Sequence, residues 1–360
     1  MARPFNFGPG PAMLPESVLQ IVQAELLDWK GRGLSIIEMT HRGDDFLSIA
    51  RKAEADLRQL IGIPNHYKIL FLQGGATGQN AAVPLNLLGD KKTADYVNTG
   101  HWSTRSINEA KKYCDVHIAA SSENSGFWHV PPQSEWKFSA DPAYVHICSN
   151  ETISGVEYSF MPDTGAIPLV ADMSSNILSR PFDINKFGLI YAGAQKNIGP
   201  TGVTLVIVRE DLLGKVKSVC PSVIDYTLEL GYEWMYNTPP TFPVYVSGLV
   251  FEWIIKKGGL AAIEKINIEK ANKLYAEVDR TGFYTNKVNK RDRSRMNVTF
   301  YLPTPELDQR FAQEAKTRDL LNLKGHKVAG GIRASIYNAM PMAGVDALIA
   351  FMRDFEKRYG

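Results

Sequence analysis

Strand-like apolar runs alternate with amphipathic helical segments through most of the chain. The runs at 67–72, 94–97, 143–147, 167–171, 187–192 and 202–208 have the length of strands and many β-branched or aromatic residues. Apolar residues recur at helical spacing in segments such as 19–29 and 46–57, which precede the first run, and in 82–88, which follows it. This alternation predicts an α/β protein with a mostly parallel central sheet and helices on its faces.

The length of 360 residues favours two domains. A long helical pattern begins near residue 244, is interrupted at 256–259 and resumes to about residue 278. It is followed by two further strand patterns, at 295–301 and 331–337, and by helices from Glu306 and through 345–355. We therefore expect an N-terminal arm at 1–15, a large domain at 16–255 and a small α+β C-terminal domain at 256–360.

Charge and cysteine content exclude several kinds of partner. Forty basic and 38 acidic side chains give a net charge of +2, too small to attract nucleic acid or a membrane surface. The three cysteines are far apart and lack metal-ligand spacing, so we expect neither a disulfide framework nor a metal site. No apolar signal core follows Met1 and no run approaches bilayer length. These features predict a cytoplasmic protein.

Lys196 directly follows one of the predicted strands and is surrounded by small residues in Tyr191-Ala192-Gly193-Ala194-Gln195-Lys196-Asn197. Ligands of open α/β sheets bind at such strand ends. A lysine shielded from water loses its proton more easily and can then attack an aldehyde. A solvated lysine in a turn is the commoner alternative for an isolated lysine.

Three further features fit a phosphorylated aromatic cofactor. The turn at 74–78 joins glycines to a helix start and can bind a phosphate, although a tight strand-to-helix turn explains the glycines equally well. Asp172 ends a strand and can hold a pyridinium nitrogen protonated, or cap a helix. Trp102 can stack on a flat ring, or belong to the core. With Lys196 they indicate pyridoxal phosphate.

Basic residues form a separate set, His41, Arg42, His326, Lys327 and Arg333. Arginine binds carboxylate and phosphate through a planar fork, so these groups suit a substrate with an anion at each end. Each of them taken singly is more often a solvated or paired charge.

The motifs together resemble the phosphoserine aminotransferases, a family of class V, fold type I pyridoxal-phosphate enzymes. The resemblance runs the whole length of the chain and includes 6–15, 41–43, 74–75, 94–97, 150–153, 171–175, 191–197, 237–241 and 333–338. It implies a homodimer with shared active sites. It also implies the transfer of an amino group from L-glutamate to 3-phosphohydroxypyruvate, giving O-phospho-L-serine in serine biosynthesis. The 4-phosphohydroxythreonine step of vitamin B6 biosynthesis is a second candidate reaction.

The resemblance also assigns roles to single residues. It implies that Lys196 is the Schiff-base lysine, Asp172 the pyridinium partner, Trp102 the stacking ring and Thr152 a partner of the cofactor's phenolic oxygen. It places Ala76, Thr77 and Gln195 at the cofactor phosphate, together with Asn237 and Thr238 of a second subunit. It places Arg333 at the substrate α-carboxylate. The distal anion of the substrate would be bound by His41, Arg42, His326 and Lys327. Thr77 and Lys327 stand where some bacterial members have arginine.

Three other functional classes compete with this interpretation. A nicotinamide-dependent oxidoreductase needs an ordered G-x-G-x-x-G, which the chain lacks. A desulfurase of the same class needs a cysteine on a loop near the site, and no cysteine lies in a recognisable loop of that kind. A scaffold protein does not need Lys196, Asp172 and the basic residues together.

Overall fold

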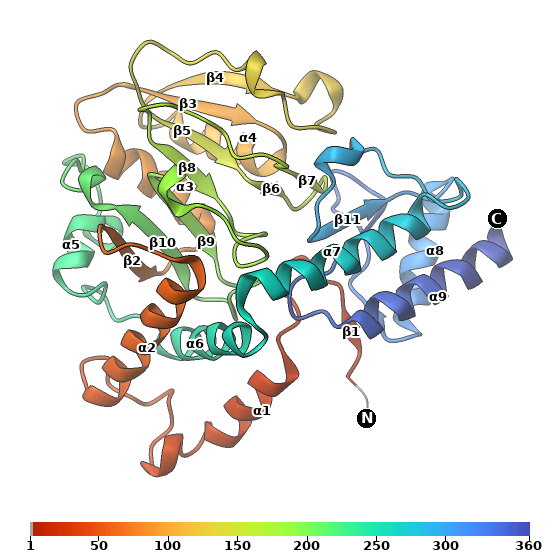
Figure 1. Cartoon of the computed structure of the whole chain (residues 1–360), viewed down its shortest axis with the longest axis horizontal. Coiled ribbons are helices and arrows are strands. Elements are labelled where there is room, and N and C mark those ends of the chain that lie inside the picture. The colour runs from red at the N-terminus through yellow and green to blue at the C-terminus, as the bar shows by residue number, and fades with distance from the viewer. Residues whose placement is uncertain (1–2) are drawn as a thin grey trace.

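The computed structural model describes residues 3–360, and a seven-stranded sheet forms the centre of its larger part (Figure 1). Strand β10 is antiparallel to both of its neighbours, and all other pairs in the sheet are parallel. The α/β fold class is therefore confirmed. In spatial order the strands are β2 (Tyr67–Leu72), β10 (Thr204–Arg209), β9 (Leu189–Gly193), β8 (Leu169–Asp172), β5 (Pro142–Cys148), β3 (Thr93–Asn98) and β4 (Asp115–Ser121).

Burial explains which strands the sequence reveals. Strands β5, β8 and β9 are buried along their whole length, as expected for parallel strands covered on both faces, so they read as continuous apolar runs. The six predicted runs match six strands to within two residues at each end. Strand β4 is not among them, because it lies at the sheet edge, where Ile118 is exposed and the run loses its apolar signature.

Helices cover the sheet and use the apolar stripes seen in the sequence. Helix α2 (Asp44–Ile61) buries Phe46, Ala50 and Leu57 on one face and ends at Gly62, whose φ of 75° closes the helix in a left-handed conformation. It packs against α6 (Thr241–Lys256). The other helices of this part are α1 (Glu16–Glu25), α3 (Gly75–Leu87), α4 (His101–Ala110) and α5 (Tyr226–Gly231).

The C-terminal part has a hydrophobic core of its own, which contains Phe300, Phe311 and Phe351. Strand β11 (Asn297–Phe300) pairs antiparallel with β13 (Ile332–Ser335), and helices α8 (Pro305–Lys316) and α9 (Met342–Tyr359) pack beside them. The N-terminal strand β1 (Phe5–Asn6) pairs with β12 (Leu320–Leu321). The start of the described chain therefore pairs with a strand of the C-terminal part, a pairing that the sequence pattern does not reveal.

Helix α7 (Gly259–Val278) connects the two parts, and Figure 1 shows it running from one to the other. Its Leu260 and Ile263 belong to the larger core, whereas Leu274 and Val278 belong to the smaller one. The break before α7 is at Gly258, where φ is 97°. Between the two cores the Nζ of the fully buried Lys270 lies within hydrogen-bond distance of three carbonyl oxygens in the segment that follows β13, those of Ile336 (3.0 Å), Tyr337 (2.7 Å) and Met340 (3.1 Å).

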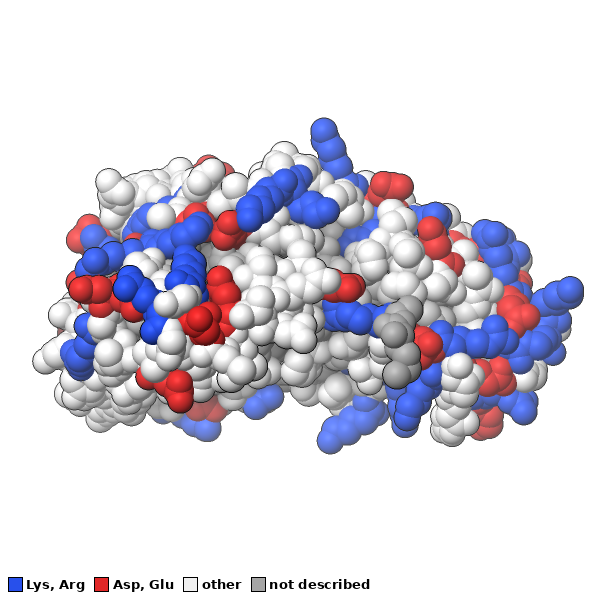
Figure 2. All heavy atoms as spheres, turned by 90° about the horizontal axis from the view of Figure 1, so that it is seen from below, with Lys and Arg blue, Asp and Glu red and all other residues white. Residues whose placement is uncertain are grey.

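Charges of both signs are mixed on the face shown in Figure 2, in keeping with the small net charge. Within residues 3–360, no helix has both the length and the apolar character needed to cross a membrane.

Candidate active site

A cavity of about 300 Å³ lies at the carboxyl ends of the parallel strands. Cys148 ends β5 beside Asp172 at the end of β8, and Lys196 follows the end of β9. The carboxyl ends of parallel strands meet at one edge of the sheet, so these side chains converge. Many of the predicted site residues line this cavity, namely Ala76, Thr77, Trp102, Thr152, Asp172, Gln195, Lys196, His326 and Arg333.

Lys196 is held by contacts with two other cavity residues. Its Nζ donates a hydrogen bond to Thr152 Oγ1 (2.8 Å) and lies 5.8 Å from the centroid of the Trp102 ring. Burial lowers the pKa of the Lys196 amine, and the nearby Asp172 carboxylate partly offsets this effect. The amine therefore loses its proton more readily than a solvated lysine does.

Gly10 allows the N-terminal segment to approach this lysine. Its φ of 139° is a conformation that favours glycine, and a Cβ there would lie 3.2 Å from Gln195 Cγ and 3.4 Å from Lys196 Cγ. The backbone of Ala12 also donates a hydrogen bond to the Gln195 carbonyl (2.9 Å). The segment before α1 thus forms one wall of the cavity.

Asp172 is buried, and its Oδ1 accepts a hydrogen bond from the Ser174 backbone N–H (2.8 Å). Burial raises the pKa of this carboxyl group, while the hydrogen bonds from Ser174 and the charge of Lys196 lower it. A cationic ring nitrogen next to Asp172 would add a second compensating charge. The carboxylate is therefore suited to such a partner.

Trp102 is positioned by Glu151, a residue to which the sequence analysis gave no role. The fully buried Glu151 carboxylate accepts hydrogen bonds from the backbone N–H groups of Trp102 and Ser103 (2.9 Å each) and from Ser103 Oγ (2.8 Å). It thus caps the start of α4. Burial raises the pKa of Glu151, and these hydrogen bonds oppose the rise. The motif Asn150-Glu151-Thr152 was visible in the sequence, but its acidic member gives no sign there of reaching α4.

The turn before α3 has the geometry of an anion site. Gly74 and Gly75 have φ values of 91° and 66°, and α3 begins immediately after Gly74. The first N–H groups of a helix have no partner within the helix, and they lie at the positive end of its dipole. Ala76 and Thr77 in this first turn line the cavity, as does Gln195.

Arg333 supplies positive charge from the C-terminal part, and His326 supplies an imidazole whose pKa is lowered by burial and by the neighbouring Arg333. Arg333 lies on β13, is buried, and its Nε has no hydrogen-bond partner among the described residues. Burial also lowers its pKa. The His326 ring lies 5.6 Å from the ring of His101 at the start of α4. A buried arginine with an unused donor is suited to hold a carboxylate.

Five predicted residues do not line this cavity. Arg42, Lys327, Asn237 and Thr238 are exposed, and His41 is half-buried. Asn237 and Thr238 instead lie against Gln73, which donates a hydrogen bond to the Thr238 carbonyl (2.7 Å). The residues that line the cavity without having been predicted include Gly10, Arg105, Cys148, Asn150 and Ser175.

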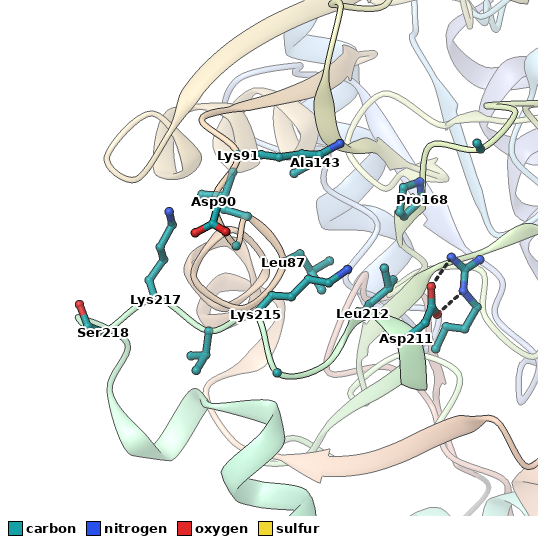
Figure 3. Close-up of a pocket in the computed structure, with 16 residues that line it drawn as sticks. Leu87, Asp90, Lys91, Ala143, Pro168, Asp211, Leu212, Lys215, Lys217 and Ser218 are labelled. Carbon is teal, nitrogen blue, oxygen red and sulfur yellow. Dashed lines mark hydrogen bonds and ion pairs between the residues drawn. The ribbon is translucent and has the colours of Figure 1, made fainter.

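A larger recess of about 810 Å³ opens at the opposite edge of the sheet (Figure 3). Ala143 and Pro168 place it at the amino ends of β5 and β8. Its Lys91 pairs with Asp141 (2.7 Å). Ligands of such sheets bind at the carboxyl ends instead, so the smaller cavity is the candidate active site. Within residues 3–360, no cluster of three or more His, Cys, Asp or Glu side chains could hold a metal ion.

The fold and the cavity agree with the comparisons with known proteins. The family model described as aminotransferase class V matches residues 4–348. The chain therefore belongs to the class V aminotransferase family.

Two similar relatives are phosphoserine aminotransferases. A phosphoserine aminotransferase of Janthinobacterium sp. (strain Marseille) is 56% identical over 363 residues, covering 100% of both chains. One from Pseudomonas aeruginosa (strain LESB58) is 55% identical over 358 residues, covering 99% of both.

Solved structures agree with these relatives. Phosphoserine aminotransferase from Bacillus circulans subsp. alkalophilus has a TM-score of 0.97 and 46% identity over 99% of both chains. The phosphoserine aminotransferase from Trichomonas vaginalis, described as bound to pyridoxal phosphate, has a TM-score of 0.94 and 41% identity over 98% of this chain and 100% of that one.

Proposed function

We propose that the protein transfers the amino group of L-glutamate to 3-phosphohydroxypyruvate and releases O-phospho-L-serine and 2-oxoglutarate. This is the reaction of a phosphoserine aminotransferase, a transaminase of serine biosynthesis, and its cofactor is pyridoxal phosphate. The observation that carries the proposal is the placement of the Lys196 amine, bonded to Thr152 and lying beside Trp102 in a cavity that also contains Asp172 and Arg333.

The cavity residues fit this cofactor. The turn at Gly74–Gly75 leaves the first N–H groups of α3 available to a phosphate, and the half-buried Trp102 presents its indole beside the lysine. Lys196 would hold the cofactor at Nζ, Asp172 at the ring nitrogen, and Ala76, Thr77 and Gln195 at the phosphate. Thr152 would bond the phenolic oxygen. When bound, pyridoxal phosphate supplies the electron sink that makes the substrate's Cα proton removable.

The remaining steps depend on side chains of the protein itself. Arg333 would hold the substrate α-carboxylate through its planar fork, which fixes the direction of the Cα–H bond. Lys196, with its lowered pKa, would take that proton and return it to a neighbouring carbon. The His326 side chain would contribute to the binding of the distal anion. One basic site serves both substrates, because glutamate and the phosphorylated 2-oxo acid each carry a second anion.

A desulfurase of the same class fits the structure less well. Cys148 lines the cavity, but it is buried, and burial raises the pKa of its thiol well above the usual range. Cys114 and Cys220 do not line the cavity, and burial raises their pKa values to about 11. A cysteine nucleophile needs a stabilised thiolate, and none of the three cysteines has one.

A coupled assay with glutamate as donor tests the reaction. We expect turnover of 3-phosphohydroxypyruvate, and we propose the 2-oxo acid that corresponds to 4-phosphohydroxythreonine, the vitamin B6 precursor, as a second substrate. Failure with both phosphorylated acids, in a protein that still binds pyridoxal phosphate, would refute the substrate assignment and leave the cofactor class intact.

We also propose a homodimer with shared active sites. His41, Arg42, Asn237 and Thr238 do not line the cavity of their own chain. Large apolar side chains lie exposed in the two segments that contain these residues, 27–42 and 219–238. Among them are Leu27 (85% exposed), Ile37 (58%), Val219 (75%) and Tyr232 (49%). Covering these side chains with a second copy would remove apolar surface from water and bring the four polar residues to the partner's cavity.

Subunit complementation tests this arrangement. Lys196→Ala and Arg42→Ala should each be nearly inactive alone. If the two residues serve a site from different subunits, mixing the refolded variants should restore about a quarter of the wild-type sites, because half of the dimers are mixed and each has one intact site. No recovery in a mixture that demonstrably contains mixed dimers would contradict the shared site.

The cellular location and the domain division of the protein are two further proposals. We propose a cytoplasmic location, which cell fractionation tests. We also propose the division into an arm at 1–15, a large domain at 16–255 and a small domain at 256–360. The separate core of the C-terminal part supports this division, and limited proteolysis near residue 256 tests it.

A further inference from the structure

Arg105 is a cation at the cavity without a partner of its own. It lies on α4 one turn after Trp102, lines the cavity, and its guanidinium carbon is 5.9 Å from the centroid of the Trp102 ring. Within residues 3–360 it forms no ion pair and donates no hydrogen bond. Its neighbour on the helix, Glu109, pairs with Lys112 instead (2.8 Å). The guanidinium is therefore available to a ligand.

The surroundings of Arg105 favour an anion. His326 and the buried Arg333 line the same cavity from the C-terminal part, and among the described lining residues Asp172 is the only acidic one. His101, on the same helix as Arg105, lies 5.6 Å from His326, ring to ring, so the start of α4 faces the loop that carries His326. Thr77, in the first turn of α3, lines the cavity and supplies no charge.

We propose that Arg105 binds the distal phosphate of the phosphorylated substrate and helps to select it, an inference that rests on the proposed function. Arg333 on β13 and Arg105 on α4 belong to different elements that line one cavity, so they can hold the two ends of one molecule. A guanidinium can donate two parallel hydrogen bonds to a phosphate monoester. The greater charge of the phosphate gives Arg105 a stronger effect on this substrate than on glutamate.

The cofactor is a second phosphate monoester at this site, and the experiment separates the two. Arg105→Met and Arg105→Lys are prepared as holoenzymes, together with Lys111→Met, a control for net charge at the residue that follows α4. Lys111 is exposed and does not line the cavity. The KM and kcat for phosphoserine and for glutamate are measured, and pyridoxal phosphate is titrated into each apoprotein by absorbance.

We expect Arg105→Met to raise the KM for phosphoserine about tenfold, the loss of one charge-assisted hydrogen bond, with kcat nearly unchanged. The KM for glutamate should rise less, Arg105→Lys should recover part of the loss, and Lys111→Met should behave as wild type. An unchanged KM for phosphoserine in Arg105→Met would overturn the inference. A weakened cofactor affinity with unchanged KM would overturn it too, since Arg105 would then serve the cofactor.

Failure of the proposed function gives a different result. A wild-type holoenzyme that cannot turn over phosphoserine refutes that function, whereas the anion site is still tested by calorimetric titration with inorganic phosphate. Phosphate should bind about tenfold more weakly to Arg105→Met than to Lys111→Met. Equal binding to both variants would overturn the role of Arg105 whatever the reaction is.

Discussion

Replacing Gly100 by alanine tests how Trp102 is positioned. Gly100 directly precedes α4, and its extended backbone conformation is one that any residue can adopt. The effect of the substitution is therefore steric. An added Cβ would lie 2.5 Å from Glu151 Cδ and 2.7 Å from Oε2, closer than real contacts allow. The Glu151 side chain is fully buried, and its carboxylate is bonded to the start of α4. The carboxylate must move away from the start of α4.

The cost follows from the hydrogen bonds that this movement breaks. The part-buried backbone N–H of Trp102 and the buried one of Ser103 lose their acceptor, at about 1–3 kcal/mol each. We therefore expect Gly100→Ala to lower the free energy of unfolding by about 4 kcal/mol. With an unfolding entropy of about 0.75 kcal/mol/K for a chain of this length, the melting temperature should fall by about 5 °C.

The assay is thermal unfolding of the apoprotein, with kcat of the holoenzyme as a second readout. Gly231→Ala is the matched control, because a Cβ at Gly231 meets no atom within 4 Å. Shortening the clashing partner, as in Gly100→Ala/Glu151→Ala, should cost clearly less than the sum of the single changes. A Gly100→Ala protein that melts with the control, or a strictly additive double variant, would refute the reasoning.

Three further perturbations give defined results. Burial lowers the pKa of Lys270 to about 7, whereas the unfolded chain keeps a pKa near 10.5, so between these values the unfolded state binds one more proton. The free energy of unfolding, relative to that of Lys270→Met, should therefore rise by about 1.4 kcal/mol per pH unit in this range. A free energy difference that stays constant from about pH 7.5 to 9 in denaturant unfolding would contradict this. Thr152→Val removes the hydroxyl that lies beside the Lys196 amine and would bond the cofactor's phenolic oxygen, so it should weaken cofactor binding about tenfold in an absorbance titration. Thr152→Ser should stay near wild type, and equal affinity of Thr152→Val and Thr152→Ser would exclude the contact. Thr304→Ala removes the hydroxyl that accepts a hydrogen bond from the Leu307 N–H at the start of α8, and should lower the free energy of unfolding by about 1 kcal/mol in urea. A Thr304→Ser protein as unstable as Thr304→Ala would argue against this cap.

The sequence predicts those parts of the site that depend on strand ends. Lys196 and Asp172 follow buried apolar runs, and parallel strands bring such positions to one edge of the sheet, which places both residues at one cavity. The glycines at 74–75 are similarly visible, because few other residues adopt their backbone angles.

Other parts of the site depend on contacts between distant segments. Glu151 caps α4 across the sheet edge, and Arg105 looks like any solvated arginine in a helix until the cavity is seen. Strand β1 pairs with β12 through two residues, too few to leave a pattern. Such features arise from tertiary packing, which local periodicity does not encode.

The central claim is that Lys196 is the residue that binds the cofactor and moves the proton. Borohydride treatment of the holoenzyme, followed by digestion and mass spectrometry, identifies the lysine bonded to pyridoxal phosphate, and turnover of Lys196→Ala is measured in parallel. We expect the reduced cofactor on the peptide that contains Lys196 and no measurable transamination by Lys196→Ala. A label on another lysine, or near-normal transamination by Lys196→Ala, would contradict the account.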